Sequence, residues 1–294
     1  MDPNGGKKNL FNKLGRKEAI QRLNEETFKR VTVSFYKYVF IQDPAHFRDV
    51  LFSKWNSFQA FGRIYVAKEG INAQMSVPEL NWKNFVKDIN TIDELKDIPF
   101  KIAVEDDGKS FFKLTIKVRN KIVADGLSQN DYDVTNVGKH LTAQQWNDAI
   151  DNGATIVDMR NHYESEIGFF EGAIKPDVDT FRDSLPIIEK TIIKNNEDKN
   201  LLMYCTGGIR CEKASAYFKH KGFENVFQLE GGIIEYARQV KDQNIENKFK
   251  GKNFVFDERR SEQISTDIVS KCHQCGSPCD TPVSYTHLTL PTSD

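Results

Sequence analysis

Residues 201–211 have the sequence Leu-Leu-Met-Tyr-Cys-Thr-Gly-Gly-Ile-Arg-Cys, an apolar strand that runs into a glycine-bearing loop and then into a helix. In an α/β protein such a loop lies at the carboxyl edge of the sheet, where ligands bind. Glycines permit conformations in which successive N–H groups point inward, and the helix N-terminus adds positive potential. The stretch therefore predicts an anion cradle around the sulfur of Cys205. The predicted cradle consists of Thr206, Gly207, Gly208, Ile209 and Arg210.

The cradle makes Cys205 the candidate catalytic residue. It stabilises a thiolate or a persulfide anion, and thiolate formation is what makes a cysteine nucleophilic. Arg210 adds positive charge. Cys211 follows six residues later in the first helical turn, so we expect it to face the core or the neighbouring loop, as a supporting residue without strong nucleophilicity. The alternative, a buried inert cysteine, leaves the two glycines and the arginine unexplained.

The elements around this loop alternate between strand and helix over residues 137–245, which predicts a small parallel α/β domain. Thr142 with Gln145 forms a capping box, and the helix that it starts ends near Gly153. The predicted strands lie at 154–158, near 173–174, at 201–204 and at 226–229; the predicted helices include 211–221 and 234–240.

Residues 31–124 show the order β-α-β-β-α-β, which is typical of a ferredoxin-like split βαβ sandwich with its helices on one face of an antiparallel sheet. Helices are predicted after Asp43-Pro44 and from Pro78, because proline is favoured at the first helical position. Strands are predicted at 31–41, 61–67 and 71–77, and a further strand or hairpin between residues 100 and 118.

The last of these strands carries a cationic face. From residue 112 to residue 121, apolar side chains alternate with polar and basic ones, so one face belongs to the core and the other is exposed. The exposed face either binds RNA phosphates or is a solvated sheet edge guarded by lysine, and both interpretations stay open. The candidate RNA-binding residues are Lys113, Lys117, Arg119 and Lys121.

The remaining segments flank or connect the two domains. Residues 1–30 form a basic leader with an excess of four positive charges, which is either functional or a solvated or tag-derived extension. Residues 125–136 are polar and turn-rich, as in a linker. Residues 246–281 form a cysteine-containing C-terminal segment, and residues 282–294 are expected to be a non-native, dispensable tail.

Three cysteines in the C-terminal segment form half of a zinc-ribbon pattern. Cys272, Cys275 and Cys279 are candidate metal ligands, but a closed tetrahedral site needs four. His273 lies between two of them and does not easily share their metal. The alternative is a set of exposed, oxidisable thiols.

The composition excludes several classes of protein. Among 294 residues, 39% are apolar and 28% charged, which is the composition of a globular chain and not of a disordered one. Neither a membrane span nor a secretory signal is present, so we expect the cytoplasm and no membrane partner. Lys and Arg number 41 against 42 Asp and Glu, and any polyanion must therefore bind to a local patch. Five cysteines, an odd number, do not form a disulfide framework.

The Cys205 loop resembles that of the rhodanese family, in which a cysteine opens a six-residue cradle and carries a persulfide. Asp158-Met159-Arg160 is similar to the family's Asp-x-Arg signature, which makes Asp158 and Arg160 supporting residues, and Glu230-Gly231-Gly232 is similar to its downstream glycine motif. Cysteine phosphatases place five residues between Cys and Arg, whereas this chain has four. The smaller cradle favours sulfur over phosphate.

A narrower resemblance extends over residues 32–280. The stretches that carry it lie at 34–38, 69–73, 106–110, 122–126, 203–215 and 251–259, and all resemble the bacterial tRNA uridine(34) hydroxylase family. This family is rhodanese-related. Membership implies hydroxylation of the wobble uridine of tRNA to 5-hydroxyuridine, with molecular oxygen as co-substrate, tRNA as partner and Cys205 as the essential residue. The family continues with further cysteine pairs, so that zinc is possible in its full-length members and doubtful here.

Two other functions stay open beside this one. They are a persulfide or thiosulfate sulfurtransferase, and a rhodanese-like module that binds a partner without catalysis. The ferredoxin-like domain argues against the first alternative and the retention of Cys205 against the second. No protein partner can be inferred from the sequence.

Overall fold

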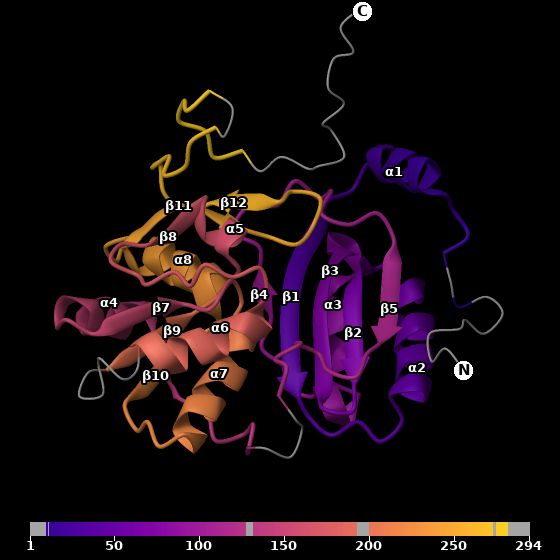
Figure 1. Cartoon of the computed structure of the whole chain (residues 1–294). Helices are drawn as coiled ribbons and strands as arrows, with labels where there is room; N and C mark the ends of the chain where they lie inside the picture. The colour runs from indigo at the N-terminus through magenta and orange to yellow at the C-terminus, as the bar shows by residue number, and fades with distance from the viewer. Residues whose placement is uncertain (1–9, 11, 128–131, 193–199, 273–274, 282–294) are drawn as a thin grey trace, which may run out of the picture.

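The protein forms two domains that lie side by side (Figure 1). The structure is a computed structural model and describes residues 10, 12–127, 132–192, 200–272 and 275–281. The expected non-native tail at 282–294 lies outside the described residues. Within the described ranges, no helix is long and apolar enough to cross a membrane.

The N-terminal domain contains a mixed sheet whose described strands have the order β4-β1-β3-β2-β5. These strands are β1 (Arg30–Tyr38), β2 (Phe61–Ala67), β3 (Gly70–Pro78), β4 (Lys101–Ile102) and β5 (Leu114–Val118). The pairs β1–β3, β1–β4 and β2–β3 are antiparallel, as in the predicted ferredoxin-like order. β5 pairs with β2 in parallel.

The predicted hairpin between residues 100 and 118, and with it the all-antiparallel sheet, is therefore wrong, because β4 and β5 lie at opposite edges. The Asp106-Asp107-Gly108 turn is real, since the Asp106 carboxylate accepts a hydrogen bond from the Gly108 N–H at 2.9 Å. The same carboxylate also accepts the Thr32 hydroxyl at 2.9 Å. The turn is thus fixed to β1 and does not fold β5 back onto β4.

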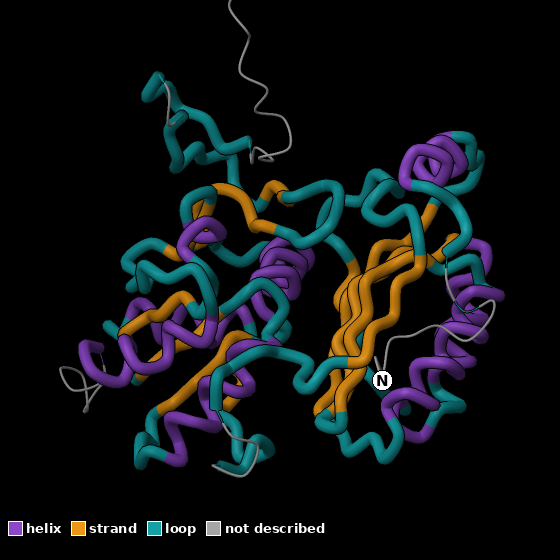
Figure 2. Tube along the Cα trace, turned by 45° about the vertical axis from the view of Figure 1, so that its right-hand side comes forward, coloured by secondary structure: helices purple, strands orange, loops and turns teal. Residues whose placement is uncertain are grey.

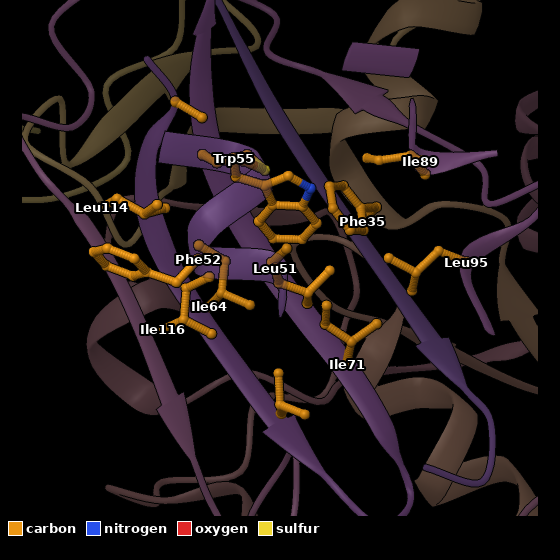
Figure 3. Close-up of a cluster of buried hydrophobic side chains, with 14 of the residues drawn as sticks. Phe35, Leu51, Phe52, Trp55, Ile64, Ile71, Ile89, Leu95, Leu114 and Ile116 are labelled. Atoms are coloured by element: carbon orange, nitrogen blue, oxygen red, sulfur yellow. The ribbon is translucent and has the colours of Figure 1, made fainter. Parts of the chain in front are cut away.

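Two helices cover one face of this sheet, and the other face points toward the C-terminal domain (Figure 2). They are α2 (Pro44–Ser57) and α3 (Glu79–Ile89), and a short 3₁₀ turn, η1 (Asp93–Leu95), follows. The Asp43 side chain caps α2 by accepting the N–H groups of Ala45 and His46, as Asp43-Pro44 predicts. Trp55 of α2 is fully buried at the centre of the apolar cluster, with Phe35, Ile71 and Ile116 around it (Figure 3).

The described part of the basic leader packs onto the N-terminal domain. Helix α1 (Arg16–Asn24) buries Ala19 and Leu23. Arg30 already belongs to β1 and is buried in an ion pair with Glu26 at 2.6 Å. A wholly solvated extension over residues 1–30 is therefore the wrong interpretation for these residues.

The C-terminal domain is built on a parallel sheet with the described strand order β6-β10-β9-β7. The strands are β6 (Lys139–Leu141), β7 (Thr155–Asp158), β9 (Leu201–Tyr204) and β10 (Val226–Leu229); β9 and β10 have the predicted bounds, whereas the three-residue β6 has no counterpart in the sequence analysis. Helices α6 (Phe181–Ile187) and α7 (Ile209–His220), with the π turn η2 (Ile188–Ile192), pack on one face. Helices α4 (Ala143–Asp151) and α8 (Gly232–Gln243) pack on the other.

The C-terminal segment is an integral part of this domain. Its strand β11 (Phe249–Phe254) pairs with β12 (Ser261–Gln263) and, through Phe249–Gly251, with β8 (Gly168–Phe170). The strand predicted near 173–174 is a single bridge between Val157 and Ile174. Helix α5 (His162–Ser165) follows β7 and precedes β8, and it begins at a capping box formed by Asn161 and Glu164. The segment also reaches the first domain, since Glu262 accepts the Val104 N–H at 3.1 Å.

A buried ion cluster joins the two domains. Lys213 of α7 donates to both carboxylate oxygens of Glu69, each at 2.9 Å, and lies 2.8 Å from Asp125. Asp125 opens the predicted linker at 125–136, and its side chain is buried. Farther along this linker, Tyr132 packs against Tyr217 of α7. The linker thus contains no helix or strand among its described residues but is held on the C-terminal domain.

Candidate active site

A cavity of about 370 Å³ lies between the domains, and Cys205 forms part of its wall. The open face of the N-terminal sheet supplies the opposite wall, with Tyr36 from β1, Arg63 from β2 and Asn72 from β3. Alternation along each strand puts these polar side chains opposite the apolar core. Pockets that bind small ligands have volumes of roughly 300–1,000 Å³, so the cavity is large enough for one nucleobase.

The loop after β9 holds its amides around the Cys205 sulfur. The Gly208 N–H donates to Sγ at 3.1 Å, and the N–H groups of Arg210 and Cys211 also point to it. Gly208 has φ 94° and caps α7, a conformation that glycine adopts without strain. The backbone and the first turn of α7 thus place several donors at one sulfur atom.

The downstream glycine motif fastens α8 to this loop. The N–H groups of Ile233 and Ile234 donate to the carbonyl oxygens of Cys205 and Thr206 at 3.1 and 3.2 Å. Gly232 has φ 69°, and a Cβ atom there would lie 2.5 Å from the Cys205 carbonyl oxygen. Only glycine fits this approach, which explains why Glu230-Gly231-Gly232 accompanies the cysteine loop.

The two loop cysteines have opposite acidities. Burial alone would raise the pKa of Cys205, but the hydrogen bond from Cys211, the Arg210 charge and the backbone amides lower this pKa to about 6. Burial and the neighbouring Cys205 raise the pKa of Cys211 well above its ordinary value. Near neutral pH, Cys205 is therefore a thiolate that accepts a hydrogen bond from the neutral Cys211 thiol.

The guanidinium of Arg210, which is expected to add positive charge to the cradle, is paired with an acidic side chain. It donates to both oxygens of Glu164 on α5, at 2.6 and 2.8 Å. This pair is buried, and the carboxylate neutralises much of the arginine's charge. Arg210 still lowers the pKa of Cys205, but its main contacts fix the loop to α5. Glu164 appears in the sequence only as the third residue of a capping box.

Asp158 and Arg160 brace the sheet beneath the site and do not line the cavity. Arg160 is fully buried and donates to Asp158 at 2.6 Å and to the Gly168 carbonyl oxygen at 2.6 Å. The Tyr204 hydroxyl donates to the same carboxylate at 2.7 Å. The pair therefore connects β7, β8 and β9, so that the end of β9 and the cysteine that follows it are held in place.

The N-terminal domain contributes contacts that the sequence analysis does not identify. The Tyr36 hydroxyl donates to Glu212 at 3.0 Å, and the Tyr38 hydroxyl donates to the Ile209 carbonyl oxygen at 3.2 Å. Lys101 of β4 lines the cavity together with Cys205. Tyr36 and Tyr38 lie in a stretch that carries the family resemblance, whereas no pattern in the sequence singles out Lys101.

Three of the four candidate RNA-binding residues are exposed at the edge of the N-terminal sheet. We call Lys113, Lys117 and Arg119 the basic strip. The register places Lys117 opposite Tyr65 of β2, and the Arg119 guanidinium lies 5.4 Å from the centre of the Tyr65 ring. Since Tyr65 lines the cavity, Lys117 and Arg119 continue the cavity wall outward.

Lys121 does not join this strip. β5 ends at Val118, and the Lys121 ammonium group is turned inward to the Asp125 carboxylate and the Leu127 carbonyl oxygen. The strand is thus shorter than the alternation from residue 112 to residue 121 predicts. The ion pair leaves Lys121 only partly exposed.

The C-terminal cysteines do not form a metal centre in the part of the chain that the structure describes. There, no group of three or more His, Cys, Asp or Glu side chains is arranged to hold a metal ion. Cys272 and Cys279 are partly buried and Cys275 is exposed, all as free thiols. His273 lies outside the described residues. The donor set as it stands does not fit a tetrahedral zinc site.

Comparison with known proteins places the chain in a family. Residues 30–122 match the profile described as a UPF0176 acylphosphatase like domain, residues 142–239 a rhodanese-like domain and residues 250–288 a rhodanase C-terminal region. A protein of Leptospira interrogans named tRNA uridine(34) hydroxylase is 52% identical over 95% of this chain and 76% of its own length. Proteins of the same name from Photorhabdus laumondii and Yersinia pestis are 50% and 52% identical over 92% of this chain and 77% of theirs. The fold prediction of a ferredoxin-like domain followed by a rhodanese-like domain is confirmed, and the chain belongs to the tRNA uridine(34) hydroxylase family.

Proposed function

We propose that this protein hydroxylates uridine 34 of tRNA to 5-hydroxyuridine, with Cys205 as the nucleophile and molecular oxygen as the oxidant. The main support for this reaction is sequence identity. Over nearly the whole chain, about half of the residues are identical to those of proteins named tRNA uridine(34) hydroxylase. The cavity between the domains supports the role of Cys205, because a buried thiolate lies in the wall of a space that accommodates one base.

The first chemical step is an addition to the uracil ring. The Cys205 sulfur forms a bond with C6, and the electron pair of the C5=C6 double bond moves onto C5 and the O4 carbonyl. C5 becomes electron-rich, which is the condition for reaction with an oxidant. The cradle amides keep the sulfur anionic before the step and accept it back when the ring is released.

The complete reaction needs a reductant beside oxygen. One atom of O2 enters the C5–H bond and the other leaves as water, so two further electrons and two protons are required. Two equivalents of a thiol supply both and become a disulfide, which balances the reaction. Loss of the C5 proton and expulsion of the Cys205 thiolate then restore the aromatic 5-hydroxyuracil.

The basic strip supports tRNA as the partner. Lys117 and Arg119 of this strip lie beside the cavity-lining Tyr65, so phosphates next to an inserted base meet positive charge. Phosphate contacts supply most of the affinity in nucleic-acid complexes and make it dependent on salt. Because the net charge of the chain is −1, attraction of a polyanion depends on a local patch such as this strip.

Mass spectrometry of nucleosides from treated tRNA tests the proposal. The protein is incubated with unmodified tRNA under ¹⁸O2 and a dithiol, beside a Cys205→Ser variant and a tRNA with cytidine at position 34. We expect ¹⁸O-labelled 5-hydroxyuridine from the parent protein and uridine-34 tRNA only. Absence of product under all conditions, or label from water in place of O2, contradicts the proposal.

A covalent trap tests the nucleophile separately. tRNA that contains 5-fluorouridine offers C6 for addition but does not release the ring by loss of a C5 proton. We expect a protein–RNA adduct that maps to Cys205 and survives denaturing electrophoresis. An adduct that forms equally with Cys205→Ser would mean that another residue attacks the ring.

A persulfide sulfurtransferase is the second candidate function, because the same amide cradle stabilises a Cys205 persulfide. Transfer of sulfur from thiosulfate to cyanide measures this activity directly. Rapid transfer without 5-hydroxyuridine formation would replace the first proposal by this one.

A further inference from the structure

Lys101 is a buried cation that opens on the Cys205 cavity. Its residue is 6% exposed, and its aliphatic chain runs along the cysteine loop and the glycine motif. Cβ atoms at Gly207 and Gly231 would lie 3.9 Å from Cδ and 3.6 Å from Cε of Lys101. Its Nζ lies 4.2 Å from the centre of the Tyr36 ring. The N-terminal domain thus delivers an ammonium group to the wall that contains the nucleophile.

In contrast to the other buried lysine of the interface, this one forms no ion pair with a carboxylate among the described residues. Lys213 has two carboxylates and a carbonyl oxygen within 3.2 Å. Among the residues that the structure describes, Lys101 Nζ has no hydrogen-bond or ion-pair partner, and it lies over the Tyr36 ring. A buried charge without a partner is costly, and its retention beside a nucleophile indicates a use.

The acidic groups nearest to Lys101 are engaged with other partners. Glu212 of α7 accepts hydrogen bonds from Tyr36, His140 and Gln228. Glu235 of α8 accepts from Arg238 and Gln239. Arg210 is paired with Glu164. The ammonium group of Lys101 is therefore the cation at this end of the described cavity that remains available to an anionic ligand.

We propose that Lys101 is a catalytic residue that donates a hydrogen bond to the uracil carbonyl oxygen O4, on which negative charge collects when Cys205 adds to C6. This inference rests on the proposed function. The S–C6 bond forms, the C5=C6 pair moves toward O4, and the Lys101 N–H meets the developing charge. The proton stays on, or returns to, the amine when the thiolate is expelled. A preorganised donor of this kind lowers a barrier by acting at the transition state.

The proposal predicts a particular pH dependence. Burial lowers the pKa of Lys101 to about 8, against the opposing effects of Cys205, Glu212 and Glu235. His140 also faces this group, and its own pKa is raised, chiefly by the hydrogen bond to Glu212. Activity should rise as Cys205 loses its proton above about pH 6 and fall as Lys101 loses its proton above about pH 8. The pH–rate profile is then a bell between these values.

Two substitutions at Lys101, with one matched control, test the role. Lys101→Met removes the charge but keeps the length, Lys101→Arg keeps the charge, and Lys139→Met removes an exposed lysine of β6. We expect Lys101→Met to lower kcat by about 100-fold or more, as the loss of one transition-state donor does, with the Kd for tRNA within threefold. Lys101→Arg should retain more activity and move the alkaline limb to higher pH. Lys139→Met should match the parent.

Each opposite result overturns the proposal. A Lys101→Met protein with kcat within threefold of the parent, with the loss confined to KM, or with the alkaline limb unchanged, excludes the catalytic role. If Lys101→Met does not fold, as judged by circular dichroism, Lys101→Arg decides, because an unmoved alkaline limb then excludes the role.

Alkylation of Cys205 separates this inference from the proposed function. Iodoacetamide labelling of the free protein involves neither tRNA nor oxygen. Removal of a nearby cation should move the labelling profile of Cys205 to higher pH in Lys101→Met and leave it unchanged in Lys139→Met. A parent protein that makes no 5-hydroxyuridine contradicts the proposed function, whereas an active parent with an equally active Lys101→Met contradicts only the role of Lys101.

Discussion

The cysteine loop of the C-terminal domain and the open face of the N-terminal sheet meet at one cavity, but they hold their charged side chains in opposite ways. In and beneath the loop, Arg210 and Arg160 are buried in ion pairs with Glu164 and Asp158. On the sheet face, Lys101 is buried and forms no ion pair with a carboxylate among the described residues. The difference indicates that the paired charges of Arg210 and Arg160 position the backbone, whereas the charge of Lys101 is available to a ligand.

The largest expected effect comes from substitution of the nucleophile, Cys205. Cys205→Ser should abolish 5-hydroxyuridine formation and the iodoacetamide label that peptide mapping assigns to the cysteine loop near neutral pH, because Cys205 is the described cysteine whose sulfur lies in the amide cradle. Cys211→Ser should keep measurable activity, since the hydroxyl still donates to the thiolate. Product and labelling are measured side by side under reducing conditions. Equal loss in both variants would mean that the two cysteines act as a pair.

The next effect contrasts the paired arginine with the unpaired lysine. Glu164→Gln leaves the buried Arg210 without its carboxylate, so the free energy of unfolding should fall by about 3–5 kcal/mol. Lys101→Met removes a buried charge that has no ion-pair partner among the described residues, and it should leave stability equal or higher. Urea denaturation of both variants measures the difference. Comparable destabilisation by the two substitutions would show that Lys101 is also a structural residue.

A smaller effect concerns the outer part of the sheet face. Combined Lys113→Ala, Lys117→Ala and Arg119→Ala should weaken tRNA binding by about tenfold or more at 0.15 M salt and reduce the slope of log K against log salt by about 1 for each lost phosphate contact. Lys121→Ala is the matched control, because this lysine is turned inward to Asp125. Filter binding at several salt concentrations gives the slopes. If the triple variant binds tRNA like the parent at all salt concentrations, the basic strip does not bind tRNA and is a sheet edge guarded by lysine.

The smallest effect sharpens the role of Cys211. Burial raises the pKa of Cys205, yet this pKa is only about 6. The largest effect that lowers it is the hydrogen bond from the Cys211 thiol. In the parent, labelling that peptide mapping assigns to Cys205 should therefore rise with pH through about 6, as the thiolate forms. In Cys211→Ala the donor is lost and the thiolate is less stable, so the same rise should come at higher pH. An unmoved profile would attribute the acidity to the amides and Arg210 alone.

Local patterns were sufficient for much of the fold. Asp43-Pro44 predicts the start of α2, and the Thr142 capping box predicts the start of α4, because a cap depends on hydrogen bonds within one turn. The strands at 201–204 and 226–229 have their predicted bounds, since buried parallel strands are short apolar runs. The prediction of a hairpin between residues 100 and 118 is wrong, because β4 and β5 pair with strands that lie far away along the chain.

The sequence by itself determined the cysteine loop, the two domains and the family, because these are encoded by residues that are neighbours in the chain. A strand, two glycines and a helix start suffice to place amides around Cys205. Only the tertiary structure decided which charges are free. Arg210 is neutralised by Glu164, 46 positions earlier, and Lys101 reaches Cys205 from another domain. Electrostatic interactions depend on distance in space, and side chains far apart in the sequence become neighbours only when the two domains pack together.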